Sequence, residues 1–216
     1  MNIKHARLEP WKMGRLVTEW IYKTPARVAA RKLNLNNKTA DLWYGKIRQG
    51  ILSQPDNVFF DGIVEIDETY LSDGIAGQKR TATADKVAVF GIYSRKYRQV
   101  FATVVDRPST EYLMPLILDH VAKGSTVHSD MFGAYRYLKD MGYKHYAIPH
   151  GHTYSLGYGV HSNSIESFWR FLQDSLRGKR GLKRSAYQTH VQEAVFLFNH
   201  QDNRSLRLTL KRFLDS

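Results

Sequence analysis

The sequence predicts an α/β protein in which a mixed sheet with flanking helices follows a small helical domain. Apolar residues repeat at helical spacing near the N-terminus, and they alternate with a period of two after about residue 62. Further along, predicted strands and helices alternate, which is typical of crossover connections in α/β folds. A polar, proline-containing segment at 53–57 separates the two patterns. The domains are therefore predicted as residues 1–55 and 56–216.

The N-terminal domain is expected to be helical and to bind DNA. Apolar residues between Trp11 and Ile21 follow a helical stripe. Two short helices are then predicted over 26–33 and 38–49, joined by a tight turn. This arrangement is typical of a helix-turn-helix, and a small packing or dimerisation domain is the alternative. The candidate DNA contacts on the second helix are Lys38, Thr39, Lys46 and Arg48.

The second domain is expected to open with three strands and to continue with alternating helices and strands. The second and third strands are predicted to form an antiparallel hairpin, because only five residues separate them. The later elements are long enough to form crossover units. In chain order, the predicted elements are strands 62–71, 86–93 and 99–105, helix 110–122, strand 126–129, a helix ending near 141, strand 145–148, and helices 164–176 and 187–199.

Charge is distributed unevenly along the chain, whose formal net charge is +12. Residues 1–55 hold 11 Lys or Arg against 3 Asp or Glu, and residues 170–184 hold 6 against 1. Between them, residues 56–169 hold 11 basic and 13 acidic side chains. Basic regions that flank an acidic middle indicate a polyanion-binding protein whose central site gathers cations. A generally solvated basic surface is the alternative.

Composition excludes several other classes of protein. The chain has no cysteine, so it forms neither disulfides nor thiolate zinc sites. No apolar run approaches the length of a membrane span, and the N-terminus has no signal-peptide pattern. No membrane partner is therefore expected.

Three acidic residues are the candidate catalytic and metal-binding residues. Asp67 lies inside a predicted strand, where aspartate is disfavoured, and violations of local preference tend to mark function. Asp130 follows the end of a strand, and Glu166 lies in the first turn of a later helix. Carboxylates that converge from separate elements suit magnesium or manganese, and two such ions can stabilise the entering and leaving oxygens of phosphodiester chemistry.

Each acidic residue also has a structural alternative. Asp130 can cap a helix that begins at Met131. Asn163 and Glu166 stand three residues apart, as in a capping box. Asp67 can be an exposed acid on a strand. Spacing alone does not decide between these interpretations.

Three sequence blocks around these acids resemble the catalytic blocks of DDE transposases. They read Val-Glu-Ile-Asp-Glu-Thr-Tyr at 64–70, Gly-Ser-Thr-Val-His-Ser-Asp at 124–130 and Gly-Val-His-Ser-Asn-Ser-Ile-Glu-Ser-Phe-Trp at 159–169. Supporting matches lie at 145–150, 176–178, 198–199 and 203–204, so the resemblance covers about residues 24–204. The sequence is most similar to bacterial insertion-sequence transposases in the group related to the eukaryotic Merlin elements.

The resemblance implies a ribonuclease H-like catalytic domain with a metal-dependent triad of Asp67, Asp130 and Glu166. It implies two Mg²⁺ or Mn²⁺ ions and an N-terminal helix-turn-helix module. The implied partners are double-stranded DNA, namely transposon terminal inverted repeats and target DNA. Two ends must be held together, so a homodimer or higher assembly is expected on DNA. The implied location is the bacterial cytoplasm, in association with the nucleoid.

The implied reaction is metal-dependent cleavage at the transposon end, followed by attack of the freed 3′-hydroxyl on target DNA. A structure-specific nuclease on the same fold and a catalytically idle, domesticated DNA-binding regulator are the alternatives. The candidate DNA contacts near the third acid are Arg170, Arg177, Lys179, Arg180, Lys183 and Arg184. Phe168 and Trp169 are expected to be core residues, because large aromatic side chains usually serve packing.

The sequence departs from the family pattern in two ways. Many relatives carry a cysteine zinc ribbon at the N-terminus, which this chain cannot form. Some relatives have Asn or His in place of the third acid, so Asn163 is the alternative to Glu166 at that position.

Overall fold

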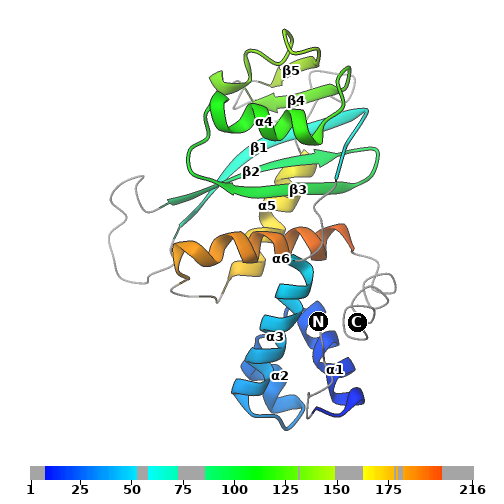
Figure 1. Cartoon of the computed structure of the whole chain (residues 1–216), viewed down its shortest axis with the longest axis vertical. Coiled ribbons are helices and arrows are strands. Elements are labelled where there is room, and N and C mark those ends of the chain that lie inside the picture. Colours follow the sequence, from blue (N-terminus) through cyan, green and yellow to red (C-terminus); the bar gives the residue numbers. More distant parts are fainter. Residues whose placement is uncertain are drawn as a thin grey trace. The chain divides into compact units, whose positions relative to one another are not determined.

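The computed structural model divides into two compact units (Figure 1). One contains the helices before Pro55, and the other spans Asp56–Asn199. The described residues are 8–52, 58–72, 86–130, 132–148, 163–177, 179 and 182–200. The predicted domain boundary at 53–57 lies outside them. Among the helices of this described part, none is long and apolar enough to cross a membrane.

The first unit is a group of three helices that pack around small and aromatic side chains. Trp20 and Trp43 are nearly fully buried, and Ala30 and Ala40 let the helices approach closely. The turn between the second and third helices contains Asn34 at φ 51°, a conformation that asparagine tolerates better than most residues. The helices are α1 (Pro10–Ile21), α2 (Ala26–Lys32) and α3 (Asn37–Leu52).

The second unit is built on a five-stranded mixed sheet with the order β3-β2-β1-β4-β5. The pairs β1–β2 and β2–β3 are antiparallel, whereas β1–β4 and β4–β5 are parallel. This confirms the predicted mixed sheet, with an antiparallel start and later crossover units. The strands are β1 (Ile63–Ser72), β2 (Lys86–Ser94), β3 (Gln99–Val105), β4 (Thr126–Asp130) and β5 (Lys144–Ile148).

Helices cover both faces of the sheet (Figure 1). Val64, Ile66 and Phe90 point to the face where α4 (Thr110–His120) packs, and they join one apolar cluster. Alternate residues of the same strands belong to a second cluster with α5 (Asn163–Leu176) and α6 (Tyr187–Asn199). Because successive strand residues point to opposite faces, a sheet covered on both sides needs apolar residues at nearly every position. The burial of β2, which is continuous from Val87 to Ile92, shows this pattern.

Helix α6 covers the outer edge of the sheet as well as its face. The side-chain oxygen of Gln188 accepts a hydrogen bond from the Val104 amide at 2.8 Å. Asn199 pairs with both backbone groups of Val100, at 2.7 and 2.8 Å. An unpaired strand edge is a template for aggregation. Two polar residues at opposite ends of α6 therefore satisfy β3 where no further strand pairs with it in the described sheet.

The helix predicted between Asp130 and about Met141 is wrong. The structure has a 3₁₀ turn, η2 (Gly133–Tyr135), followed by further turns up to Gly142. Tyr135 and Leu138 are both fully buried in the core on the α4 side. The amides of Tyr135 and Leu138 bond to the carbonyls of Phe132 and Tyr135, three residues earlier, at 3.1 Å each, so the segment forms successive tight turns and both side chains enter the core.

Trp169 of α5 lies directly on the sheet above Gly91 of β2, so we expect this glycine to be essential. A Cβ atom at Gly91 would stand 2.6 Å from Cη2 of the indole. Gly91→Ala should therefore lower the free energy of unfolding by roughly 1–3 kcal/mol, the usual cost of overpacking. Gly133→Ala, where an added Cβ meets nothing within 4 Å, is the control and should change it by less than about 0.5 kcal/mol. Denaturant titration measures both, and equal values would contradict this packing.

Candidate metal centre

The candidate metal centre lies where β1 and β4 diverge. These parallel strands pair only from Ile63 to Glu65 on β1, opposite Thr126 to His128 on β4. Beyond that point Asp67 and Glu68 continue along β1, and Asp130 ends β4. A carboxylate oxygen from each of these three residues lies within 4.8 Å of the others. Because β1 and β4 separate beyond Glu65, the side chains of the three acids can lie between them.

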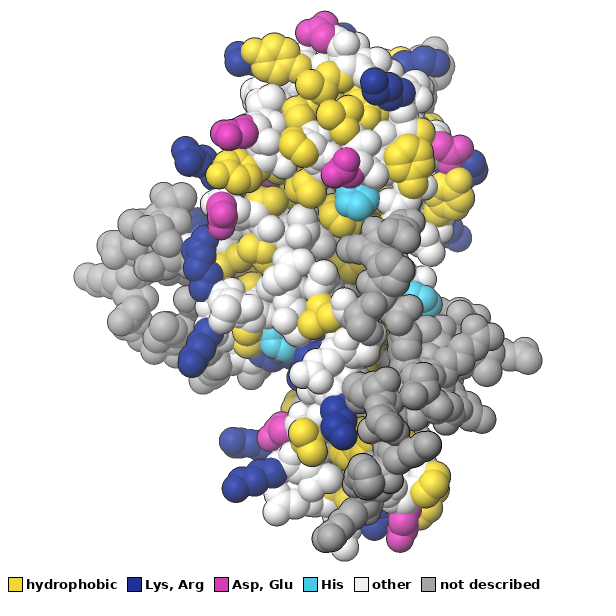
Figure 2. Space-filling view, viewed as in Figure 1, with side chains coloured by type: hydrophobic (Ala, Val, Ile, Leu, Met, Phe, Trp, Pro, Cys, Tyr) yellow, Lys and Arg dark blue, Asp and Glu magenta, His cyan; other side chains and the backbone are white. Residues whose placement is uncertain are grey.

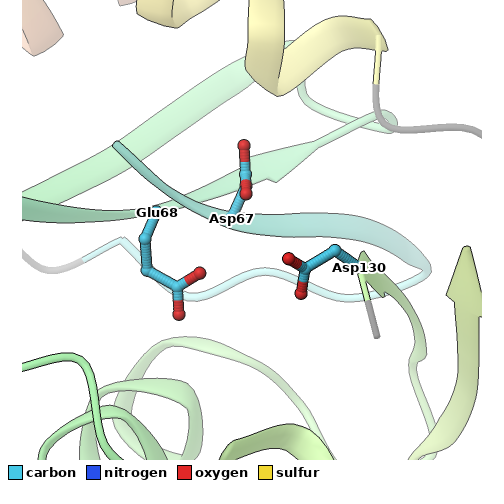
Figure 3. A group of neighbouring side chains, drawn as sticks. All are labelled: Asp67, Glu68 and Asp130. Carbon is cyan, nitrogen blue, oxygen red and sulfur yellow. The ribbon is translucent and has the colours of Figure 1, made fainter. Parts of the chain in front are cut away.

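Glu68 joins the cluster from the face of the sheet opposite Asp67. In Figure 3 the two side chains leave β1 in opposite directions, and Asp130 reaches toward them from the end of β4. The Asp67 carboxylate accepts a hydrogen bond from the Trp169 indole at 2.9 Å. The Tyr135 hydroxyl donates to Glu68 from the other side. The carboxylates of Asp67 and Glu68 therefore both lie near Asp130, although the two side chains leave opposite faces of the sheet.

Burial and like charge perturb the acids of this cluster. Burial raises the pKa of Asp67 to about 6, with further increases from the charges of Asp130 and Glu166, while the Trp169 hydrogen bond acts in the opposite sense. Burial also raises the pKa of Glu68 to about 7, assisted by Asp67 and Asp130 and opposed by the Tyr135 hydrogen bond. A cation would relieve this repulsion.

The donor set fits a hard divalent cation. Three carboxylates from two strands provide anionic oxygen ligands, which are the donors that Mg²⁺ and Mn²⁺ prefer. The half-buried position weakens competition from water for the charge of the acids. The residues present are therefore compatible with the predicted Mg²⁺ or Mn²⁺.

Glu166 lies beside this cluster and is not a member of it in the described structure. It is the fourth residue of α5, its side chain is 50% exposed, and Arg170 contacts it at 3.8 Å. One turn later on the same helix, Trp169 is bonded to Asp67. The charge of Glu166 contributes to the raised pKa of Asp67, so the two are electrostatic neighbours. Asn163 is exposed and is the first residue of α5.

The capping alternatives for Asp130 and Asn163 take a different form in the structure. The Asp130 side chain does accept a hydrogen bond from the Phe132 amide, at 2.9 Å, but it caps a turn and no α-helix begins there. At the start of α5, the amides of Ser164 and Ile165 donate to Glu65 of β1, at 2.9 and 3.0 Å. An acid on the sheet thus fills the role that the sequence suggested for a local cap.

Comparison with known proteins identifies the family of this chain. Residues 59–199 match the family described as the ISXO2-like transposase domain, and this match includes well over half of the chain. The chain belongs to this transposase family. It is also 24% identical over 116 residues to an uncharacterized transposase-like protein of Haemophilus influenzae, a match that covers 54% of this chain and 94% of the relative. The family match places the acid cluster inside the transposase domain, and Glu166 as well.

Two solved structures have a partly similar fold. The catalytic core domain of BIV integrase aligns with a TM-score of 0.41 at 13% identity, over 63% of this chain and 82% of the other. The HTLV-2 integrase catalytic core domain, determined in complex with magnesium in a dimeric form, aligns with a TM-score of 0.39 at 10% identity. This alignment covers 65% of the transposase chain and 86% of the HTLV-2 chain.

The basic side chains expected to contact DNA differ in how they are engaged. On α3, Lys38 is exposed and Lys46 lies 4.7 Å from the Trp43 ring centroid. Lys179 is held by Glu193 at 3.2 Å, in an ion pair with a buried carboxylate. Four further side chains at or beyond α5 are exposed, namely Arg170, Arg177, Lys183 and Arg184. Arg180 lies outside the described residues. Thr39 is half-buried near the start of α3, and Arg48 is half-buried with its guanidinium 6.0 Å from the Tyr44 ring centroid.

The sequence predicts Asp67, Asp130 and Glu166 as site residues and indicates no role for Glu65 or Glu68. The only signal for them in the sequence is that Glu65 and Glu68 are crowded beside Asp67 in one predicted strand. Their partners, Arg95 and Tyr135, are 30 and 67 residues away along the chain. Trp169 was correctly predicted as a core residue, since it is 5% exposed. Its hydrogen bond to Asp67 was not foreseen.

We expect Glu68→Gln to stabilise the metal-free protein at alkaline pH. With a folded-state pKa of about 7 against an ordinary value of 4.5, folded Glu68 keeps a proton that the unfolded chain has released. The free energy of unfolding of the wild type therefore falls as the pH rises from about 4.5 to about 7. In chelator at pH 8, the variant should exceed wild type by on the order of 1–3 kcal/mol, and at pH 5 the two should converge.

Thermal denaturation at both pH values measures this difference. Glu111→Gln, which neutralises an exposed acid on α4, is the control and should show no such dependence on pH. A Glu68→Gln protein less stable than wild type at pH 8 would contradict the repulsion described here.

Proposed function

We propose that this protein is a DNA transposase that cleaves transposon ends and joins them to target DNA, using Asp67, Asp130 and Glu166. The observation that carries the proposal is the convergence of Asp67 and Asp130 where β1 and β4 diverge, within a transposase family domain. Asp67 and Asp130 belong to separate strands, so only the folded sheet forms the site. Divalent cations bound there would neutralise charge at the phosphodiester and activate the attacking oxygen.

The proposed division of labour follows from the environment of each acid. Asp67 is oriented by the hydrogen bond that it accepts from the Trp169 indole, and one of its oxygens lies within 4.8 Å of oxygens of Glu68 and Asp130. Asp130 ends β4, and the amide of Phe132 restricts its orientation. Glu166 projects from α5, the helix that covers the same face of the sheet as Asp67. Its exposure suits a residue that meets DNA and metal together.

Glu68 is proposed as a supporting acid rather than the third member of the triad. Tyr135 engages its carboxylate on the α4 side of the sheet, in the core. A phosphodiester of duplex DNA must approach from solvent, where Glu166 is exposed. Glu68 would instead add negative charge to the site that holds the cation. Two ions are proposed, because the negative charge of three or four carboxylates is balanced better by two divalent ions than by a single ion.

The catalytic unit is proposed to be ribonuclease H-like. The support is its own topology, in which three antiparallel strands are extended on the β1 side by parallel β4 and β5. Helices on both faces complete the layers (Figure 1). In this arrangement the two aspartates lie on neighbouring central strands.

The first unit is proposed to be a helix-turn-helix that recognises double-stranded DNA. α2 and α3 are joined by a four-residue turn, and Lys38 is exposed at the start of α3, where recognition helices contact bases. Lys and Arg side chains are visible on the described helices of this unit and along one edge of the second (Figure 2). Thr39, Lys46 and Arg48 are the further candidates on α3, and exposed Arg170, Arg177, Lys183 and Arg184 are candidates in the second unit.

The biological partners follow from this proposal. The DNA ligands are transposon terminal inverted repeats and target DNA, bound by a homodimer or higher assembly that holds two ends together. Such a protein acts on chromosomal DNA, so a nucleoid-associated location is proposed. Membership of the group related to Merlin elements rests on the three sequence blocks that contain the acids.

A strand-transfer assay with labelled terminal DNA tests the proposed function. Wild type with Mg²⁺ should give joined products, and Asp67→Asn should give none while its DNA affinity is retained or increased, because a ligand and a negative charge are removed. Cut but unjoined products would favour a structure-specific nuclease. Binding without cleavage would favour an idle regulator. Strand transfer by Asp67→Asn in Mg²⁺ would contradict the role of Asp67.

The third position is tested by comparing Glu166→Gln with Asn163→Ser. A carboxylate is a harder and more anionic ligand than a carboxamide, so Glu166→Gln should reduce cleavage by roughly 10³-fold or more and weaken metal binding in titrations. Asn163→Ser should keep substantial activity, since the start of α5 is bonded to Glu65. An active Glu166→Gln beside an inactive Asn163→Ser would transfer the role to Asn163.

A further inference from the structure

A fully buried acid on β1 joins the start of α5 to the sheet. Glu65 has no exposed surface. One of its oxygens accepts hydrogen bonds from the Ser164 and Ile165 amides, at 2.9 and 3.0 Å. The other accepts from Nε of Arg95 at 2.7 Å. These two amides belong to the group of donors that a helix leaves unsatisfied at its start, and their acceptor here lies about 100 residues away in the chain.

Arg95 extends the connection to the strand that carries Asp130. Its Nη2 atom lies 3.2 Å from Nδ1 of His128, which is buried on β4. Glu65 and His128 are also opposite each other in the parallel pairing of β1 and β4. Arg95 itself follows β2, so one guanidinium links the β2 end to β1 and β4 just before the two strands diverge.

The same helix is tied to β1 a second time through the metal centre. Asp67 follows Glu65 by two residues, so both side chains point to the α5 face. Asp67 accepts the hydrogen bond from the Trp169 indole. Glu166 lies on α5 between these two attachments, one residue after Ile165 and three before Trp169. Its position relative to Asp67 is thus set by two contacts to one strand.

We propose that Glu65 is a positioning residue that seats the start of α5 on β1 and thereby places Glu166 beside Asp67. The inference rests on the proposed function of Glu166, and it adds a residue to that site which touches neither metal nor DNA. Arg95 orients the Glu65 carboxylate and couples it to β4. Through Glu65 and Arg95, the two strands that carry Asp67 and Asp130 and the helix that carries Glu166 are connected at one place in the fold.

Stability alone does not account for this arrangement. A helix start is satisfied readily by a local Ser, Thr, Asp or Asn. A buried ion pair often contributes no more to stability than apolar residues of similar volume, because desolvation opposes the attraction. What a buried, hydrogen-bonded carboxylate does supply is directionality. Misplacement of a catalytic group by about 1 Å can cost about 100-fold in rate, so a fixed helix start matters most for the acid that follows it.

Glu65→Gln in the full chain, with Arg95 variants beside it, tests the proposal. A carboxamide has one acceptor oxygen and cannot serve both Arg95 and the helix amides, and neutral hydrogen bonds are weaker than charge-assisted ones. The Ser164 and Ile165 amides should exchange with solvent several-fold to about tenfold faster in metal-free protein. This measurement requires no activity.

The second measurement is the metal dependence of the protein. In Glu65→Gln, the Mn²⁺ concentration that gives half-maximal thermal stabilisation should rise about 10-fold, because Glu166 would no longer be held in place beside Asp67; loss of a partner bonded directly to a ligand costs about 10- to 100-fold. Cleavage at saturating DNA should fall in kcat with KM unchanged, and high Mn²⁺ should restore part of it. Arg95→Lys, which keeps a cation beside Glu65, should stay nearer to wild type than Arg95→Met.

Glu193→Gln is the matched control. Glu193 is also a buried acid of this unit, bonded to His190 at 2.8 Å and to Lys179 at 3.2 Å, but it lies on α6. It should lower thermal stability without changing the Mn²⁺ midpoint or the exchange of the Ser164 amide. A purely structural role for Glu65 predicts that the two variants behave alike.

The outcomes separate this inference from the proposed function. Unchanged amide exchange in Glu65→Gln would overturn the anchoring of α5. Faster exchange with an unchanged Mn²⁺ midpoint would overturn the placement of Glu166. Equal Mn²⁺ shifts in Glu65→Gln and Glu193→Gln would overturn it as well. Wild type that binds Mn²⁺ but neither cuts nor joins DNA would contradict the proposed function, while amide exchange still decides whether Glu65 anchors the helix.

Discussion

Repulsion among carboxylates on and beside β1 is the constraint on which the rest of this structure depends. Asp67, Glu68 and Asp130 approach within 4.8 Å in a half-buried place, and burial raises the pKa of Asp67 and of Glu68. A fold that only had to be stable would avoid this arrangement. The sheet tolerates it because fixed donors, the Trp169 indole and the Tyr135 hydroxyl, each stabilise a carboxylate by a hydrogen bond.

The packing of α5 is arranged around the same constraint. Trp169 reaches Asp67 because Gly91, which faces Asp67 across the β1–β2 pair, has no side chain to block the indole. The start of the helix is bonded to Glu65. Apolar residues such as Phe168 supply most of the contact with the sheet. Hydrophobic burial therefore holds α5 on the sheet, and polar contacts determine where along β1 it sits.

The transposase family match and the geometry contribute different parts of the functional argument. The family match covers 59–199 and identifies the class of protein. The structure adds which acids meet, and it introduces Glu68 into the cluster while leaving Glu166 at its margin. It also shows that Lys179, a candidate DNA contact by charge, is engaged by buried Glu193. Lys38 on α3, and Lys183 and Arg184 beyond α5, are exposed instead.

The sequence by itself determined the mixed sheet and the positions of most elements, because period and turn residues are local properties. It also identified Asp67, Asp130 and Glu166 as candidates, because each lies within its own continuous sequence block. It predicted a helix after Asp130 wrongly, since the backbone there closes a 3₁₀ turn and further tight turns through bonds such as that from the Leu138 amide to the Tyr135 carbonyl. Only the tertiary structure decided that Glu68 joins the acids and that Glu65 bonds to α5. Those contacts depend on how far β1 and β4 diverge and on where a helix about 100 residues away begins, which no local pattern encodes.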